Sequence, residues 1–392
     1  MSKAGRKRNG VKRQGVGVKT VLFLDQYGGM GGGQRVLLAL AQAARDAGWR
    51  VEALLPSGPC AEALTRMGAR VRVTPECRLR EGRKGPLDAL ALLWHTLRVF
   101  CGHLAALRGA DLLYANGGRM YPLCFMASLL LRRPAAYHVH LNPGDAHMRV
   151  LRLLLRSRLT RRIALPSRYI ERVLHKAGAA FGDARARLVE NGLDERFDGV
   201  VFKDRFTGRP LRHVGVVGRV CAEKGQDALL PLAAALPRMH FHVLGDAAFY
   251  DHVYFEELKA RAPSNVHFYG WVEDIPGKAD EIGLQVCLVP SRCPAGAGTR
   301  LFEASPLVPL QMMALSCLVI PRRLGVLADM AERFGLPAFE KDDELPALLR
   351  DLAAQDGAML AAGIRENMAV ITREYSHAAF QRRLRDFFAE LD

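Results

Sequence analysis

Apolar and polar positions alternate along most of this chain in two recurring patterns. Short apolar runs predict buried strands, and apolar positions repeated every three to four residues predict amphipathic helices. In the first half of the chain, expected strands and helices alternate, which indicates a parallel sheet covered by helices. The expected strands there are 18–25, 50–56, 69–75, 111–116, 135–140, 163–167 and 187–191, and the clearest helices are 34–47, 61–68, 120–131 and 168–177.

The same alternation restarts after residue 212 and predicts a second parallel sheet. Its expected strands are 213–218, 239–246, 265–270, 284–291 and 317–321, with helices at 222–236, up to about 261, and 307–315. The chain closes on an amphipathic helix, 377–391.

We therefore expect an α/β protein with two Rossmann-like, doubly wound parallel-sheet domains that face each other across a cleft. Residues 1–18 form a basic tail that we expect to be disordered, and 19–203 form the first domain. Residues 204–373 form the second domain, after a polar linker near 197–210, and the helix at 374–392 packs back on the first. Open parallel sheets bind ligands at the carboxyl ends of their strands, so the cleft is the expected site.

Composition narrows the class of protein. The chain has 392 residues, of which 49% are hydrophobic and 24% charged, as in folded globular proteins. Its eight cysteines are scattered without a C-x-x-C pair, which favours free thiols over a disulfide framework or a zinc site. The apolar run at 123–131 is too short to cross a membrane, and the one at 21–24 is too short for a signal peptide. We expect a cytoplasmic protein, either free or lying on the inner face of the plasma membrane.

Charge is distributed unevenly between the two halves. The net charge is +16, yet residues 1–205 hold 36 Lys and Arg against 16 Asp and Glu, and residues 206–392 hold 20 against 24. A basic half favours an anionic partner such as a lipid surface, a phosphorylated lipid or a nucleic acid, and a solvated basic surface is the alternative. Two basic segments, 78–85 before a long apolar helix at 87–107 and 149–162 with its six arginines, fit a lipid interface. Helices packed on the sheet with a solvated basic face are the alternative for them.

The first motif is the glycine-rich segment 27–35, which follows the first strand. A glycine turn before a helix lets backbone N–H groups approach an anion, and a turn without a ligand is the alternative. The dinucleotide fingerprint G-x-G-x-x-G fails here because its third glycine is missing, although Glu52 stands where the ribose-binding acid would be.

The second and third motifs lie in the second half. Arg219 and Lys224 follow the strand at 213–218 and can clamp a pyrophosphate, unless they are ordinary loop cations. Ser305 is expected to cap a helix whose first residue is Pro306, and the free N–H groups of that helix would attract a phosphate beside Glu303. A capped helix that faces the core is the alternative.

Taken in order, these motifs resemble the GT-B glycosyltransferases of family 4, which are retaining enzymes that use nucleotide sugars. The resemblance covers residues 19–392 and includes ENGLDERF at 190–197, FHVLGD, NVHFYGWVEDI and EASPLVPLQMMA. It implies that Arg219 and Lys224 bind the donor pyrophosphate. Glu303 matches the first Glu of the family's Glu-x7-Glu motif, which holds hydroxyls of the transferred sugar, and Gln311 takes the second position, which binds ribose.

The resemblance also assigns residues around the reacting sugar. His140 matches the histidine placed close to that sugar, while its neighbour His138 is expected to be a core residue. The glycines match the loop near the donor phosphates, and the first residues of the third motif's helix add N–H groups: Gly31, Gly32, Gly33, Leu307 and Val308.

Three departures from the family pattern affect the donor site. Gln311 replaces a Glu and loses a charge-assisted hydrogen bond, and Pro306 offers no N–H. The segment 292–302 lengthens the span before Glu303 and bears on the identity of the sugar. No Asp-x-Asp follows a strand, so we expect neither a metal nor a cofactor, with Arg219, Lys224 and a helix dipole neutralising the leaving nucleotide.

The sequence thus predicts a retaining hexosyltransferase. It would use a nucleotide sugar and a lipid-phosphate-linked or glycan acceptor in surface polysaccharide or glycolipid biosynthesis. One alternative is a non-catalytic relative that serves as a binding or scaffold protein, which Gln311 and Pro306 favour because they depart from the family pattern. Another is a nucleic-acid-binding protein, which the basic half suggests, but aromatic residues are not interleaved with that charge, so no nucleic acid is expected.

Overall fold

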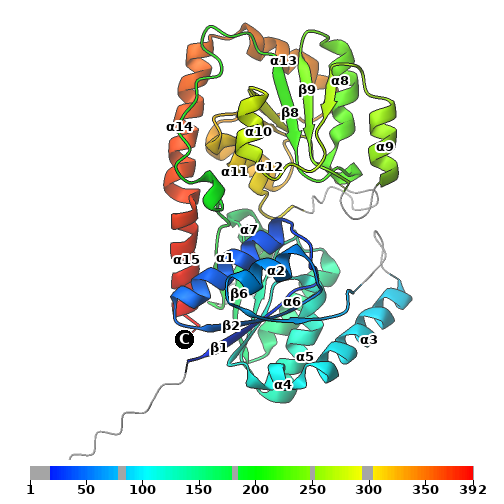
Figure 1. Ribbon diagram of the computed structural model, residues 1–392, viewed down its shortest axis with the longest axis vertical. Coiled ribbons are helices and arrows are strands. Elements are labelled where there is room, and N and C mark those ends of the chain that lie inside the picture. The colour runs from blue at the N-terminus through cyan, green and yellow to red at the C-terminus, as the bar shows by residue number, and fades with distance from the viewer. Residues whose placement is uncertain (1–17, 78–84, 179–183, 248–251, 294–302, 392) are drawn as a thin grey trace, which may run out of the picture.

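The computed structural model describes residues 18–77, 85–178, 184–247, 252–293 and 303–391. The chain forms two α/β lobes stacked along the long axis of the molecule (Figure 1). Nearly all of the expected basic tail, most of the basic segment 78–85 and most of the insertion 292–302 lie outside the described residues.

The first sheet contains seven parallel strands in the order β3-β2-β1-β4-β5-β6-β7. Its interior strand β1 is buried at every position, which explains the apolar run that follows Thr20. The strands are β1 (Thr20–Leu24), β2 (Arg50–Leu55), β3 (Arg70–Val73), β4 (Leu112–Ala115), β5 (Ala135–His138), β6 (Thr160–Leu165) and β7 (Ala186–Leu188).

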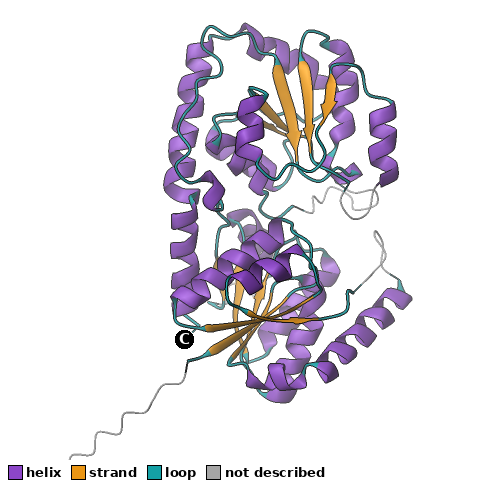
Figure 2. Cartoon of the chain, viewed as in Figure 1, coloured by secondary structure: helices purple, strands orange, loops and turns teal. Residues whose placement is uncertain are grey.

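Helices cover both faces of this sheet (Figure 2). One face packs against α1 (Gly32–Asp46), α2 (Pro59–Arg66) and the last helix, α15 (His377–Ala389). The other face packs against α3 (Pro86–Gly102), α4 (Leu104–Gly109), α5 (Tyr121–Leu131), α6 (Asp145–Arg156) and α7 (Arg168–Lys176).

The second sheet contains five parallel strands in the order β10-β9-β8-β11-β12. They are β8 (His213–Val217), β9 (His240–Leu244), β10 (Val266–Phe268), β11 (Val286–Val289) and β12 (Leu318–Pro321). One face carries α8 (Leu229–Ala235), α9 (His252–Ala260) and α13 (Leu345–Ala354), and the other carries α10 (Ile275–Glu281), α11 (Leu307–Ala314) and α12 (Val326–Phe334).

The C-terminal helices connect the two lobes. Helix α14 (Gly357–Tyr375) runs down the side of the molecule and continues into α15, which ends against the first sheet (Figure 1). Phe388 of α15 packs against Phe23 and Tyr114, with ring centroids 6.3 Å away in both cases. The chain passes between the lobes twice, and the two passages are in contact. The Leu193 N–H of one donates to the carbonyl oxygen of Tyr375 in the other at 2.7 Å.

Three expected helices have other bounds in the structure. The helix expected at 87–107 breaks at His103 into α3 and α4, and the one expected at 222–236 is two 3₁₀ turns before α8 begins at Leu229. Gly225 causes the second break, because its φ of 72° is a left-handed conformation that ends the first turn. The basic segment 149–162 is the end of α6 followed by the start of β6.

Helix α6 buries most of its leucines but leaves Leu153 47% exposed. Leu151 and Leu154 are each 1% exposed and belong to the core of the first domain, while Arg149 and Arg156 are exposed. Helix α6 therefore packs on the sheet and keeps its arginines on the outside, and the expectation of a lipid interface stays a prediction. No described helix is both long and apolar enough to span a bilayer.

Candidate active site

The loops that meet between the domains follow the switch point of each sheet. Strand order reverses between β1 and β4 in the first sheet and between β8 and β11 in the second. Doubly wound sheets bind ligands at such points, because the loops diverge there and leave room. The expected site residues lie on the segments that follow β1, β5, β8 and β11.

His140 lies two residues beyond the end of β5 and is oriented by Asn116, which follows β4. The Asn116 Nδ2 atom donates to Asp25 Oδ2 at 2.6 Å and to the carbonyl oxygen of Gly33 at 3.1 Å. The amide oxygen therefore faces His140 Nε2, 2.9 Å away, and must accept from it. This arrangement fixes the proton of His140 on Nε2 and leaves Nδ1 as an acceptor.

The charges behind His140 are set by burial. Loss of contact with water lowers the pKa of His140 to about 4, so the imidazole is neutral near pH 7. Asp25 is 1% exposed, and burial raises the pKa of its carboxyl to about 6. Hydrogen bonds from Asn116, Gln34 Nε2 (3.1 Å) and the Tyr27 N–H (2.9 Å) limit that rise. Asp25 is thus a buried anchor for the amide that holds His140.

His138 is a core residue, as expected. Its side chain is 0% exposed, and its Nδ1 atom lies 3.0 Å from the Tyr114 hydroxyl. Its ring stacks on that of His140, with centroids 4.3 Å apart and planes 4° apart. His138 supports the ring of His140 from below and does not reach the space between the domains.

The glycine segment forms a helix start, which corrects the expectation of a loop followed by a helix at Gln34. Gly31 is the N-cap in an extended conformation, and Gly32 and Gly33 are the first residues of α1. A Cβ atom at Gly33 would lie 3.8 Å from the His140 ring, and one at Gly32 would lie 3.9 Å from Leu307. The N-terminus of α1, with its unpaired N–H groups, therefore lies between His140 and Leu307 of the second domain.

Glu303 is the most highly connected of the expected residues. Its Oε1 atom accepts from Lys224 Nζ at 2.7 Å and from Ser291 Oγ at 2.6 Å, and its side chain is 14% exposed. Burial raises the pKa of Glu303, but Lys224, Ser291 and Arg219 together lower it below its usual value. Its backbone forms an antiparallel bridge with Leu141, the residue after His140. The carboxylate and the histidine therefore stand at one junction between the domains.

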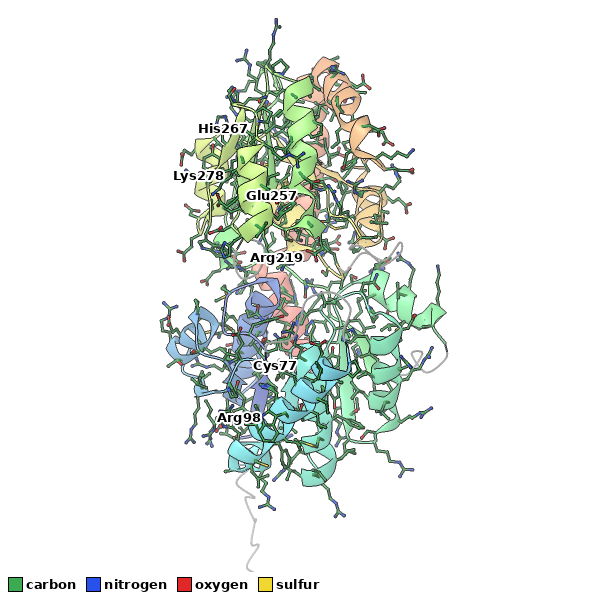
Figure 3. The ribbon with its side chains drawn as sticks, turned by 90° about the vertical axis from the view of Figure 1, so that its right-hand side faces the viewer. Cys77, Arg98, Arg219, Glu257, His267 and Lys278 are labelled. Atoms are coloured by element: carbon green, nitrogen blue, oxygen red, sulfur yellow. The ribbon has the colours of Figure 1, made fainter. Side chains whose placement is uncertain are left out.

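Arg219 stands at the junction between the two lobes (Figure 3). Its backbone is pinned, because Gln226 Nε2 donates to its carbonyl oxygen at 2.7 Å. Its exposed guanidinium makes no ion pair or hydrogen bond within the described part of the chain. Close packing holds the loop, since a Cβ atom at Gly245 would lie 1.8 Å from the carbonyl oxygen of Gly218.

Helix α11 begins at Leu307, within its predicted range 307–315, but its predicted cap is wrong. Pro306 is the N-cap and no side chain caps the helix, so Ser305 does not have the predicted capping role. Leu307 and Val308 form the first turn, and Val308 lies 3.9 Å from the Cβ position of Gly218. The N-terminus of α11 therefore lies between the start of α1 and the loop of Arg219.

Gln311 is 9% exposed, on the buried face of α11. Its amide makes no side-chain hydrogen bond to any described residue. A largely buried amide without a side-chain partner among the described residues is available to bind a ligand hydroxyl.

Another interdomain cavity, of about 650 Å³, lies on a different side of Ser305. Its lining includes Tyr169, Glu190, Arg333 and Tyr375. Neither His140 nor any of the charged residues expected at the active site lines it, so it is a separate space. Within the described ranges, no three His, Cys, Asp or Glu side chains are grouped so that they could hold a metal ion.

The sequence patterns did not identify the polar residues that position the side chains of His140 and Glu303. Asp25 and Asn116 each end an apolar strand pattern, and Ser291 follows a third. A polar side chain directly after a buried parallel strand was the available signal, because carboxyl ends of neighbouring strands converge.

Two Rossmann-like domains whose switch points face one another define the GT-B class of glycosyltransferases. The family model for glycosyltransferase family 4 matches residues 30–197, and that for the glycosyl transferases of group 1 matches residues 212–352. The chain is therefore a GT-B glycosyltransferase, a transferase enzyme, and its first domain matches family 4. No curated protein matches its sequence significantly.

Solved structures share this fold over almost the whole chain. HepE of Anabaena in complex with UDP-glucose is 20% identical, with 94% of this chain and 99% of that one covered and a TM-score of 0.72. A glycosyltransferase of Rickettsia africae is 13% identical, with coverage of 96% and 99% and a TM-score of 0.66. The lipopolysaccharide outer core galactosyltransferase WaaB, without ligand, is 14% identical, with coverage of 95% and 100% and a TM-score of 0.58.

Proposed function

We propose that this glycosyltransferase moves a hexose from a nucleotide sugar to a lipid-phosphate-linked acceptor, with retention of configuration and without a metal ion. The observation that carries the proposal is the junction at Glu303. There a carboxylate held by Lys224 and Ser291 is bridged through its backbone to the residue after His140. Hydroxyl-binding groups from both domains thus stand beside cations and two helix N-termini.

The donor pyrophosphate fits the positive side of this junction. Arg219 offers a forked pair of donors, Lys224 a point charge, and Leu307 and Val308 offer unpaired N–H groups at the start of α11. The N-terminus of α1 at Gly32 faces the same space. These groups would neutralise the negative charge that builds on the leaving nucleotide, the task that a metal ion performs in other transferases. HepE, a structural relative, is described in complex with UDP-glucose.

The transferred sugar would lie between Glu303 and His140. The carboxylate is ionised and can accept from two hydroxyls, and Nδ1 of the neutral imidazole can accept from a third. Gln311 would bind a ribose hydroxyl through its unpartnered amide. Retention of configuration is proposed from the resemblance to family 4.

The acceptor would enter through the first domain, whose arginine excess suits a lipid phosphate at the inner membrane surface. Such an acceptor places the reaction in surface polysaccharide or glycolipid biosynthesis. Closure of the two domains would exclude water, which would otherwise hydrolyse the donor.

Calorimetric titration of the purified chain with a panel of nucleotide sugars tests the proposal. One donor should bind, and Arg219→Ala and Lys224→Ala should each weaken it at least about tenfold, since each removes a charge-assisted contact. Arg209→Ala is the matched control: Arg209 is equally exposed but precedes β8, whereas Arg219 follows it. Equal weakening by the control, or folded protein that binds no donor, contradicts the proposal. Product anomers by NMR test retention, and turnover that stops in EDTA contradicts the metal-free step.

A further inference from the structure

Helix α3 exposes an unusually apolar side to solvent. Its large apolar residues recur at spacings of three and four, so they form one stripe along the helix. The opposite side packs on the first domain through His95, Thr96 and Val99, which are all buried. The exposed fractions of the stripe are 65% for Leu87, 61% for Leu90, 53% for Leu93, 69% for Trp94 and 41% for Leu97.

Neighbouring helices extend this apolar surface. Leu129 and Leu130 at the end of α5 are 47% and 65% exposed, and α3 and α5 pack against each other on the same face of the sheet. Apolar residues scattered singly over a surface need no explanation, whereas a contiguous stripe of this size marks an interaction site.

Positive charge surrounds the stripe. Residues 86–159, which contain α3 to α6, hold nine arginines and three aspartates. Arg98 on α3 itself is exposed, as are Arg108 in the last turn of α4, Arg132 after α5, and Arg149 on α6. Figure 3 faces this side of the molecule, with Arg98 labelled beside the helix.

We propose that the exposed stripe of α3 seats the first domain in the headgroup region of an anionic lipid bilayer. The inference rests on the proposed function, because it names the surface on which a lipid-linked acceptor would be met. A helix of 17 residues is about 25 Å long and can lie in the plane of the interface with its leucines in the acyl boundary. Trp94 suits that depth, where tryptophan is enriched, and the arginines meet anionic headgroups.

A second copy of the chain is a weaker occupant of this surface. A symmetric dimer through α3 would bring the same arginine-rich face of both copies together, and like charges at an interface repel. A bilayer supplies the opposite charge. Charge complementarity therefore selects the lipid surface.

The stripe is also connected to the active site. The Arg119 Nη1 atom donates at 3.0 Å to the carbonyl oxygen of Cys77, which lies in the chain that leads to α3. Arg119 belongs to the turn after β4, three residues beyond Asn116, the side chain that orients His140. Cys77 and Arg98 are labelled on the same side of the molecule in Figure 3. A bilayer at α3 would therefore meet the same domain that holds Asn116 and His140.

Co-sedimentation with vesicles tests the inference. The full chain is mixed with vesicles of phosphatidylcholine alone or with 30% phosphatidylglycerol, and the emission of tryptophan is recorded. We expect binding only to the anionic vesicles, with a blue shift of the emission. The double variant Leu90→Gln/Trp94→Ser should lose about tenfold or more in partitioning, because two large side chains no longer leave water.

The chain contains a matched control. Trp271 of the second domain is 56% exposed, against 69% for Trp94, so Trp271→Ser removes a tryptophan of similar exposure away from α3. Equal losses in the two variants, binding that survives the α3 substitutions, or no binding by the wild type each overturn the inference. A change of oligomeric state in the α3 variant would assign the stripe to a second copy and also overturn it. Donor titration of the same samples separates the two proposals, because donor binding does not require a bilayer.

Discussion

Asn116 offers the sharpest test of how His140 is held. Its side chain is 2% exposed and carries hydrogen bonds to Asp25, Gly33 and His140. Asn116→Ala removes the acceptor that keeps the proton of His140 on Nε2, so the ring can turn and take the other tautomer. We expect kcat/KM to fall roughly ten- to hundredfold, which corresponds to about 1.4–2.7 kcal/mol of lost transition-state stabilisation.

The same substitution carries a stability cost that must be measured separately. Asp25 Oδ2 and the Gly33 carbonyl lose a buried donor, and each unsatisfied group costs roughly 1–3 kcal/mol. Urea unfolding should therefore show a loss of roughly 2–4 kcal/mol. Asn265→Ala is the matched control, because the Asn265 amide donates to three carbonyl oxygens between 3.0 and 3.4 Å away in the second domain. That variant should lose stability but keep its kcat.

A double-mutant cycle decides whether Asn116 acts through His140. If it does, Asn116→Ala changes kcat little in a background that already carries His140→Ala, because the ring to be oriented is gone. If the two losses multiply in the double variant, Asn116 acts on the reaction by another route and the reasoning is refuted.

Three further predictions concern the charged and close-packed parts of the second domain. Lys224→Ala leaves the carboxylate of Glu303 without its cation, so the pKa of Glu303 should rise and the free energy of unfolding should fall by about 3 kcal/mol. The acid limb of the pH–rate profile should then move to higher pH, and a limb that does not move contradicts the pairing. Burial lowers the pKa of His242 to about 3, so below about pH 6.5 the unfolded chain binds a proton that the folded chain does not. The stability that neutral His242 contributes is therefore complete above that pH and falls toward pH 3 by up to about 1.4 kcal/mol per pH unit. Urea titrations at several pH values should show a flatter slope for His242→Gln. Gly245→Ala places a methyl 1.8 Å from a carbonyl oxygen next to Arg219, so both the melting temperature and donor affinity should drop, whereas normal affinity would show that the loop adapts freely.

Buried parallel strands were predictable because both of their faces are covered. After their first residues, Thr20 and His213, strands β1 and β8 carry no polar side chain, and the structure places them inside the predicted ranges 18–25 and 213–218. Helix α14 was not predicted from its pattern. Its Ile364 packs into one core of the second domain and its Ile371 into another, so its apolar positions do not form a single stripe.

The motif residues of the site were predictable, but the polar groups behind them were not. Glu303 and Lys224 stand in sequence patterns, whereas the chain Asp25–Asn116–His140 joins residues more than 90 positions apart at its first link. Such a contact depends on strand order, which an alternation of elements leaves open. The exposure of the apolar stripe of α3 was also not predictable, because the sequence pattern of an apolar helix is the same whether its leucines face a core or solvent.

Under the proposed function, the ion pair between Lys224 and Glu303 would tie the recognition of phosphate to the recognition of sugar. In the structure Lys224 compensates the buried carboxylate, so a pyrophosphate that draws on the same ammonium group weakens that compensation. Sugar hydroxyls that donate to Glu303 restore it, since a buried carboxylate needs donors from some source. A nucleotide sugar therefore brings both the pyrophosphate that draws on Lys224 and the hydroxyls that donate to Glu303, whereas a free nucleotide brings only the anion. The pair makes the complete donor the best-compensated ligand of the site, and it leaves a nucleotide that has lost its sugar less well held.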